Sequence, residues 1–341
     1  MVNSKALSQA LGQDFYSGRN KIINGAMEID QRNGGAIFSA PADSSYVLDR
    51  WKTQTSGGGV YSVQQSTTVP PGFKNSMVLT VTTPDSSIAA GDYYNVTQSI
   101  EGVNCVDLDF GLSTAKTITL SFWVRSSVTG TYGGSIRNSS VNRCYPFQYS
   151  ISVANTWTQI SIVIPGDTTG TWLTNTSNGL LVTFDMGTGV TYQGPANAWS
   201  GAGNYITATG STQWIATNAA TWYITGVQVE AGSIATPFER RNYGTEYALC
   251  QRYYETIRQD AYSATFLSNS YVPDGSTYSR WYFKVTKRAN PTFSILNGAT
   301  WTGITPATSC QVDQIGFYGT NISFYLSGST GVINASATAE L

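Results

Sequence analysis

The segment from residue 170 to 214 carries the side chains best suited to contact a ligand. It places aromatic rings and amides in glycine-broken loops, through Trp172, Tyr192, Gln193, Asn197, Trp199, Asn204, Tyr205 and Trp214. Sugars present polar hydroxyls beside apolar C–H faces, so their sites pair aromatic planes with amide and hydroxyl groups. Aromatic residues in turns are less often buried in a hydrophobic core than those in alternating strands. We therefore predict a glycan-binding site formed by Trp172, Tyr192, Trp199 and Trp214. The alternative is that these rings belong to the core or to a contact between subunits.

Signals for catalysis and for metal binding are few. The chain has no histidine, which excludes histidine-based triads and histidine metal sites. It also has no nucleophile elbow, phosphate-binding loop or dinucleotide-binding glycine pattern. Glycoside hydrolysis needs only two carboxylates, for which Asp85, Asp92, Asp107, Asp109 and Asp185 are available. We expect no enzymatic activity, no metal and no cofactor.

The cysteines are widely spaced. They are Cys105, Cys144, Cys250 and Cys310, without a C-x-x-C pair, which argues against zinc and against a disulfide scaffold. We expect reduced cysteines that behave as small buried hydrophobes. A disulfide between Cys105 and Cys144 is the alternative.

Charge and hydropathy exclude several classes of partner. The 341 residues include 19 Lys plus Arg and 20 Asp plus Glu, a formal net charge of −1, without a basic cluster. Nucleic acid is therefore not an expected partner. No apolar run approaches the roughly 20 residues of a membrane span, and the first residues lack the features of a signal peptide. We expect no membrane insertion and no export by the general secretory route.

The elements that must position these side chains are mostly strands. From Lys21 to Glu239 apolar residues alternate with polar ones between glycine-rich turns. In Thr117–Arg125, the residues Ile118, Leu120, Phe122 and Val124 point one way, and we expect the opposite face to be solvated. About eight such strands without intervening helices predict a jelly-roll β-sandwich.

The spacing of apolar residues changes from that of a strand to that of a helix after the predicted sandwich. Tyr243, Tyr247, Cys250, Tyr254 and Ile257 form a helical stripe, and strand-like alternation then returns. We predict an all-β protein with four parts: an N-terminal docking segment at 1–20, the sandwich at 21–241, a linker helix at 242–258 and a small β domain at 259–341. Because the segment 1–20 is too short to stabilise itself, we expect it to become ordered on a partner. A disordered terminus is the alternative.

Several sequence blocks resemble bacteriophage tail-fibre and virion-associated proteins that contain a carbohydrate-binding-module-like sandwich. The blocks are Asn20–Asn33, Leu48–Trp51, Thr225–Gly232, Ala235–Arg241, Tyr243–Glu246, Leu249–Tyr254 and Lys287–Thr292. From the residue types alone, Asp49, Arg50 and Trp51 are expected to form a buried ion pair beneath a core indole. The resemblance is specific for a virion structural protein and does not distinguish between kinds of virion protein.

The resemblance implies a protein that is made in the host cytoplasm and incorporated into the virion. A tail fibre that attaches to host-surface glycan is the function we expect, with a head fibre or capsid decoration protein as the first alternative and a glycan-degrading tailspike as the second. Residues 1–20 would contact other virion proteins. Phage adhesins of this type are commonly trimeric, so we expect a homotrimer joined through residues 243–341.

Overall fold

The computed structural model describes residues 18–259, 270–271, 277–295, 301–302, 321–326, 330–331 and 333–341. These residues form two compact units that separate after Asn242. The first seventeen residues of the predicted docking segment, and Cys310, lie outside the described residues. Within the described part, no helix has the length and hydrophobicity that crossing a bilayer requires.

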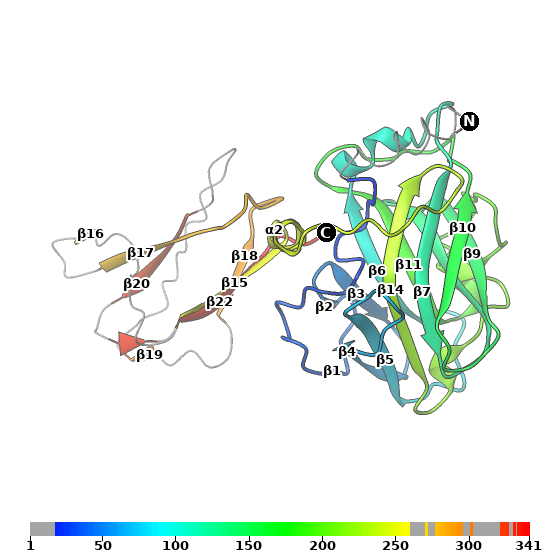
Figure 1. The fold of residues 1–341 in the computed structure, drawn as a ribbon, viewed down its shortest axis with the longest axis horizontal. Helices are drawn as coiled ribbons and strands as arrows, with labels where there is room; N and C mark the ends of the chain where they lie inside the picture. The colour runs from blue at the N-terminus through cyan, green and yellow to red at the C-terminus, as the bar shows by residue number, and fades with distance from the viewer. Residues whose placement is uncertain are drawn as a thin grey trace, which may run out of the picture. The chain divides into compact units, whose positions relative to one another are not determined.

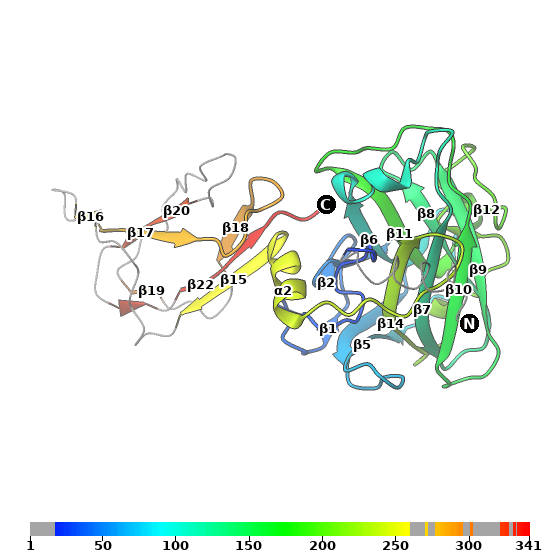
Figure 2. The same ribbon diagram turned by 45° about the horizontal axis from the view of Figure 1, so that its top comes forward.

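The first unit is a sandwich of two antiparallel sheets (Figure 1). The first sheet has six strands in the order β1 (Phe38–Ser39), β4 (Val60–Ser66), β5 (Ser76–Thr83), β14 (Thr221–Ala231), β7 (Ile118–Ser126) and β10 (Thr158–Ile164). The second has six in the order β2 (Tyr46–Leu48), β3 (Trp51–Thr55), β6 (Tyr93–Glu101), β11 (Asn178–Thr188), β8 (Gly130–Asn138) and β9 (Cys144–Ile151). The prediction of an all-β jelly-roll sandwich is confirmed. Figure 2 shows the two layers from an oblique angle.

Short elements at the ends of the strands complete this unit. They are the 3-10 turns η1 (Gly102–Asn104), η2 (Val106–Leu108), η3 (Val190–Tyr192) and η4 (Trp214–Ala216), and the parallel pair of β12 (Gln193–Gly194) and β13 (Thr207–Ala208). β13 packs across β8, β9 and β11 of the second sheet. The connections at the two ends of the sandwich therefore carry most of the irregular structure.

The core lies between the two sheets and follows the predicted alternation. On β7, the residues Ile118, Leu120, Phe122 and Val124 are all buried. Residues of the opposite sheet meet them; the ring of Phe122, for example, lies 5.0 Å from that of Phe184 on β11. Alternation with a period of two is therefore what brings the two apolar faces together.

The expectation of a solvated outer face is wrong at one end of β7. Thr119 and Ser121 point away from the core and are nevertheless buried. The reason is that the segment 232–239 folds back over this face: the hydroxyl of Thr119 donates to the carbonyl of Gly232 at 2.8 Å. Thr236 donates from its backbone N–H to the buried Glu230, at 2.9 Å. A long return segment of this kind leaves no trace in the alternation of the strand that it covers.

The chain enters and leaves the sandwich at one place, which we call the terminal clasp and define by Gly18, Asn20, Glu239 and Arg241. The carboxylate of Glu239 accepts the backbone N–H groups of Gly18, at 2.7 Å, and Asn20, at 2.5 Å. The guanidinium of Arg241 donates to the carbonyls of Asn20 and Ile22. The side chain of Asn20 also donates to Val227 at 3.0 Å. The sequence blocks at 20–33 and 225–241 therefore meet in space.

Asp49, Arg50 and Trp51 are buried, as predicted. The carboxylate of Asp49 accepts the backbone N–H and side-chain amide of Gln31, and the guanidinium of Arg50 donates to Ser99 at 2.5 Å. The indole N–H of Trp51 donates to Asn24 at 3.1 Å. These contacts connect the start of the chain to the second sheet.

The second unit begins with the helix α2 (Tyr243–Gln251), and the prediction that the helix extends to residue 258 is wrong. Arg252 and Tyr253 form a turn, and Tyr254 starts the strand β15 (Tyr254–Gln259), where it pairs with Thr338. Residues spaced for a helical stripe also fit a strand when a partner strand is available, because the strand then satisfies their backbone groups.

The remaining strands of the second unit are short. Its sheets have the orders β15-β22-β18, β16-β17-β20 and β19-β21. The strands are β16 (Ser270–Tyr271), β17 (Thr277–Tyr282), β18 (Thr292–Ile295), β19 (Trp301–Thr302), β20 (Asn321–Leu326), β21 (Thr330–Gly331) and β22 (Ile333–Thr338). A buried ion pair lies in this unit, with the ammonium of Lys287 at 2.7 Å from the carboxylate of Glu255.

Cys105, Cys144 and Cys250 are free thiols, so the alternative of a disulfide between Cys105 and Cys144 is wrong. Cys144 and Cys250 are buried, as expected, whereas the residue Cys105 as a whole is only partly buried. Burial of its thiol raises the pKa of Cys105 to about 12. Cys105 is therefore protonated and a poor nucleophile at neutral pH.

Candidate functional site

The structure separates the four predicted glycan-binding residues into three places. Trp172 and Trp199 come together beside Phe110, at the end of the sandwich where β6 ends and β11 begins. Tyr192 lies at the opposite end, where β11 ends, with its ring against Tyr93. Trp214 enters the core. The prediction that the four residues share one site is therefore wrong.

The cluster of Trp172 and Trp199 is held by contacts within the protein. The rings of Phe110, Trp172 and Trp199 pack edge to face, with centroids 4.8 to 5.8 Å apart. The indole N–H of Trp172 donates to Thr169 at 3.2 Å, and that of Trp199 donates to Pro165 at 2.7 Å. Each of these indole N–H groups therefore donates to a carbonyl of the protein itself, and the rings pack against one another at the end of the sandwich.

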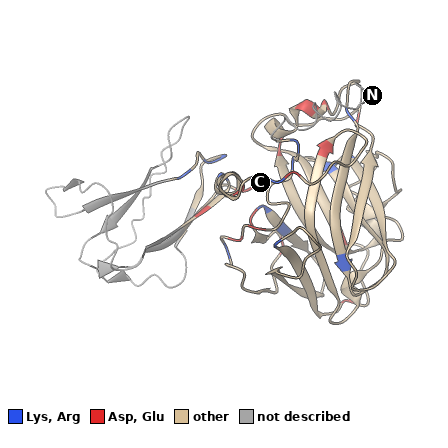
Figure 3. Ribbon diagram, viewed as in Figure 1, with Lys and Arg blue, Asp and Glu red and all other residues tan. Residues whose placement is uncertain are grey.

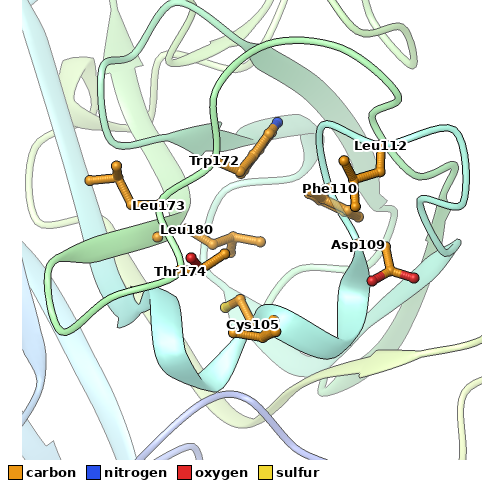
Figure 4. A pocket seen from close by; sticks show the side chains of 10 residues that line it. Cys105, Asp109, Phe110, Leu112, Trp172, Leu173, Thr174 and Leu180 are labelled. Carbon is orange, nitrogen blue, oxygen red and sulfur yellow. The ribbon is translucent and has the colours of Figure 1, made fainter.

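A small apolar pocket of about 120 Å³ lies beside this cluster. Figure 4 shows Phe110, Trp172 and Leu180 pointing into it, with Cys105 at one side. Sites for small molecules usually have about 300–1,000 Å³. This pocket is below that range and offers few polar groups to a sugar, so its walls are better explained as packing.

Trp214 is fully buried, which corrects the expectation that it would contact a ligand. It sits in η4, and its ring packs edge to face against Tyr61 with 6.4 Å between the centroids. The neighbouring Ile215 is also fully buried. A loop residue can fill the open end of a sandwich as a strand residue does, because the two sheets need a cover there.

A larger and more polar pocket, of about 350 Å³, lies at the same end as Tyr192. It is formed by the β5–β6 connection, the end of β11 with η3, and η4. The residues that line it are Asp85, Ser86, Ser87, Ile88, Ala90, Thr188, Gly189, Val190, Gln193, Gln213 and Ala216. We call this the polar end pocket. Its volume lies within the range of small-molecule sites.

The polar groups of this pocket are fixed by hydrogen bonds around Thr188. The side chain of Gln213 accepts the backbone N–H of Thr188 at 2.9 Å and donates to its carbonyl at 3.0 Å. Gln193 donates to the same carbonyl at 2.7 Å. The hydroxyl of Thr188 donates to Asp185 at 2.7 Å. Because these side chains are already ordered, a ligand would lose little entropy in ordering them.

Asp85 is the carboxylate of the polar end pocket. One of its oxygens accepts the phenol of Tyr94 at 2.7 Å, and the other accepts the backbone N–H of Ser87 at 3.1 Å. Burial raises the pKa of Tyr94, so its phenol remains a donor at neutral pH. The carboxylate is thereby held at the pocket wall.

Two tyrosines are neighbours of the residues that line the polar end pocket, although neither of them lines it, and Tyr93 pairs with the lining residue Thr188. Tyr192 lies between the lining residues Val190 and Gln193 in sequence, and its ring meets that of Tyr93 at 5.6 Å and 81°. Both rings are partly exposed. Val190, with 71% of its surface exposed, adds an apolar edge. The pocket itself thus combines amides, hydroxyls and a carboxylate, and Tyr192 adjoins its lining in sequence.

The other polar residues of the predicted loops have structural roles. The side chain of Asn204 accepts a guanidinium N–H of Arg137 at 2.8 Å, and Tyr205 packs its ring against Gly194. Asn197 turns the chain with a positive φ of 60°. These residues therefore support the 193–212 connection.

Sequence reasoning missed a layer of buried polar side chains on the outer face of the second sheet. Asn95, Thr97, Thr183, Asp185 and Arg137 point away from the core and are at most 3% exposed. The hydroxyls of Thr97 and Thr183 are 2.9 Å apart, and Arg137 donates to Thr183 at 2.9 Å. Burial lowers the pKa of Arg137 to about 10. The alternation signals an outward polar face, but it gives no sign that β13 covers part of it.

The acidic residues considered for hydrolysis make different contacts within the fold. Asp92 accepts the backbone N–H of Ala89 at 3.0 Å, and Asp107 pairs with Lys21 at 2.8 Å. Asp109 lines the apolar pocket and Asp85 the polar one. Among the residues that the structure describes, no group of three acidic or cysteine side chains is arranged to hold a metal ion.

Comparison with known proteins gives matches to solved structures only. No protein-family profile matches the chain, and no curated protein matches it. The enzymatically active domain of tailspike protein 4 from bacteriophage CBA120 aligns with 19% identity and a TM-score of 0.35, over 63% of this chain and 22% of the tailspike chain.

The other similar structures include carbohydrate-binding modules. The family 11 module of the cellulase Lic26A-Cel5E from Clostridium thermocellum aligns with 13% identity and a TM-score of 0.31, over 59% of this chain and 99% of the module. TmCBM61, solved with β-1,4-galactotriose, aligns with 9% identity and a TM-score of 0.32, over 63% of this chain and 99% of that one. At these identities and scores the likeness concerns the β-sandwich alone.

Proposed function

We propose that the chain is a non-enzymatic bacteriophage virion protein, a tail fibre that attaches the particle to glycan on the host surface. The sequence blocks described above support the virion assignment. The polar end pocket carries the proposed glycan binding, because it brings fixed amides, hydroxyls and a carboxylate together around a space of about 350 Å³.

The chemistry of the pocket matches that of a neutral sugar. The hydroxyls of a pyranose both donate and accept hydrogen bonds. The lining offers the carboxylate of Asp85 as an acceptor, the hydroxyls of Ser86 and Ser87 as donors or acceptors, and the side-chain amide of Gln193. Val190 lines the pocket, and we propose that the adjoining Tyr192 adds to the apolar surface that the C–H face of a sugar ring prefers. Of the four aromatic residues predicted from sequence, Tyr192 is the one that we retain for this site.

The function requires several copies of a weak site. A millimolar dissociation constant corresponds to only about 4 kcal/mol, too little for one copy to hold a particle. Linked copies raise the apparent affinity by roughly 10² to 10⁴ without any new contact. We therefore also propose a homotrimer joined through residues 243–341, with the part of the docking segment before Gly18 attached to another virion protein, because Gly18 and Asn20 belong to the terminal clasp.

Binding of host-cell polysaccharide by the purified protein tests the proposed site. We expect Gln193→Ala and Tyr192→Ala each to weaken binding at least about tenfold, because each removes one side of the sugar contact. Trp172→Ala is the matched control at the opposite end of the sandwich, and it should bind as the wild type does. Unchanged binding by both pocket variants, with the fold intact by circular dichroism, would refute this site.

The position in the particle is tested separately. Labelled antibodies against the protein should decorate the tail in electron micrographs of intact virions. Decoration of the capsid would replace this proposal by a head fibre or capsid decoration protein. Shortening of the polysaccharide by the purified protein would replace it by a glycan-degrading tailspike.

A further inference from the structure

The outer face of the first sheet carries a second group of aromatic and basic side chains, away from the polar end pocket. Trp157, just before β10, packs edge to face on Tyr223 of β14, with 6.1 Å between the ring centroids. The guanidinium of Arg125, on β7, lies over the same tyrosine ring at 4.8 Å. All three side chains are partly exposed.

Strand pairing places Arg125 and Tyr223 in one row across the sheet. Arg125 is opposite Tyr223, Tyr223 is opposite Val78, and Val78 is opposite Gln64. With about 4.8 Å between neighbouring strands, the row from Arg125 to Gln64 extends about 14 Å. The row is therefore an extended surface that begins with a cation on an aromatic ring.

The positive charge of Arg125 has no carboxylate partner among the residues that the structure describes. Arg125 donates through Nε to the carbonyl of Asn155 at 2.9 Å, and no carboxylate of the described residues pairs with it. The neighbouring outward residues Trp123, Gln159 and Thr221 are uncharged. Figure 3 shows how few charged residues the strands of the sandwich carry. The Nε bond and the tyrosine ring fix the guanidinium, and both Nη groups remain to receive an anion.

We propose that this row binds a sugar that carries a carboxylate, such as a uronic acid residue of an acidic polysaccharide. The carboxylate would pair with the Nη groups of Arg125, whose planar fork matches it in two parallel hydrogen bonds. The sugar ring would lie against Tyr223 and Trp157. A second copy of this face is a poor occupant, because it would bring two unpaired guanidinium groups together. The site is separate from the polar end pocket, so either can fail without the other.

An array of neutral, uronic-acid and sialylated glycans probed with the full chain tests the proposal. We expect retention of carboxylated glycans and at least about a tenfold loss of their binding in Arg125→Gln. Arg125→Lys should recover little of it, because an ammonium lacks the two-pronged geometry. Methyl esterification of the bound uronic acid should abolish binding, and added salt should weaken it.

Several results would overturn the proposal. One is an array with no carboxylated glycan retained, and another is equal binding by the wild type and Arg125→Gln. A fall in molecular mass on Trp157→Ala, by light scattering, would make the row a contact between copies instead. Arg125→Gln changes a partly exposed side chain, so its circular dichroism spectrum should match the wild type. Gln193→Ala, which changes only the polar end pocket, is the control that should leave binding of acidic glycans intact.

Discussion

Replacing Asp185 by Asn should stabilise the sandwich at neutral pH. Asp185 points outward from β11 into the buried polar layer and is 1% exposed. One carboxylate oxygen accepts Gly187 N–H at 2.9 Å and the Thr188 hydroxyl at 2.7 Å. Burial outweighs these bonds and raises the pKa of Asp185 from 3.8 to about 6. The charged form therefore costs more in the folded protein than in the unfolded chain.

The magnitude follows from the two pKa values. A rise from 3.8 to about 6 corresponds to about 3 kcal/mol at neutral pH. Between these values the folded state binds more protons than the unfolded state, so stability from this group falls as pH rises through that interval. Asparagine is neutral and keeps an oxygen for Gly187 and Thr188. We expect Asp185→Asn to raise the free energy of unfolding by about 2–3 kcal/mol at neutral pH, and by less than about 1 kcal/mol near pH 4.

Urea denaturation of the full chain, followed by tryptophan fluorescence at both pH values, measures this difference. Asp167→Asn is the matched control, because Asp167 is also buried but accepts two hydrogen bonds from Arg143 at 2.7 Å each. This control should lose stability at neutral pH, since it leaves Arg143 without its counter-charge. The reasoning is refuted if Asp185→Asn destabilises the protein at neutral pH, or if its effect is the same at both pH values.

Four further predictions concern other parts of the chain. Glu255→Gln should destabilise the second unit by about 3–5 kcal/mol, because it leaves the buried ammonium of Lys287 uncompensated; calorimetry would show its transition at lower temperature. Gly226→Ala should cost about 1–3 kcal/mol in urea denaturation, since φ is +63° and the new Cβ would lie 2.6 Å from the ring of Phe73. Deleting residues 1–17 should leave a folded protein that fails to enter particles, which immunoblots of purified virions would detect. Light scattering should give three times the chain mass of 36.7 kDa, and a monomeric mass would contradict the trimer.

The sandwich could be predicted because its signal is local. Each of the residues Ile118, Leu120, Phe122 and Val124 meets the core through the alternation of its own strand. The burial of Thr119 could not be predicted, since its cover comes from residue 232 onwards. The end of α2 was misjudged for the same reason, because a pairing between Tyr254 and Thr338 decides it.

The candidate site was harder to predict than the fold. A tryptophan in a loop looks the same in sequence whether it closes the core, as Trp214 does, or packs at an edge, as Trp172 does. The polar end pocket joins connections that lie far apart in the chain, from Asp85 to Gln213. Gln213, which holds both backbone groups of Thr188, stands beside Trp214 and carried no distinguishing signal of its own.

The terminal clasp determines how tension would pass through the molecule. Suppose that an attached particle pulls on one end of the chain while the other end is held. Because Lys21 bonds to Val229 and Gly18 to Glu239, a pull between residues 18 and 241 acts first on these few contacts. We expect these hydrogen bonds to break one after another from Gly18 inward, before the load reaches the strands of the two sheets. We therefore expect a brief load to break the contacts of the terminal clasp first and to leave the sandwich folded.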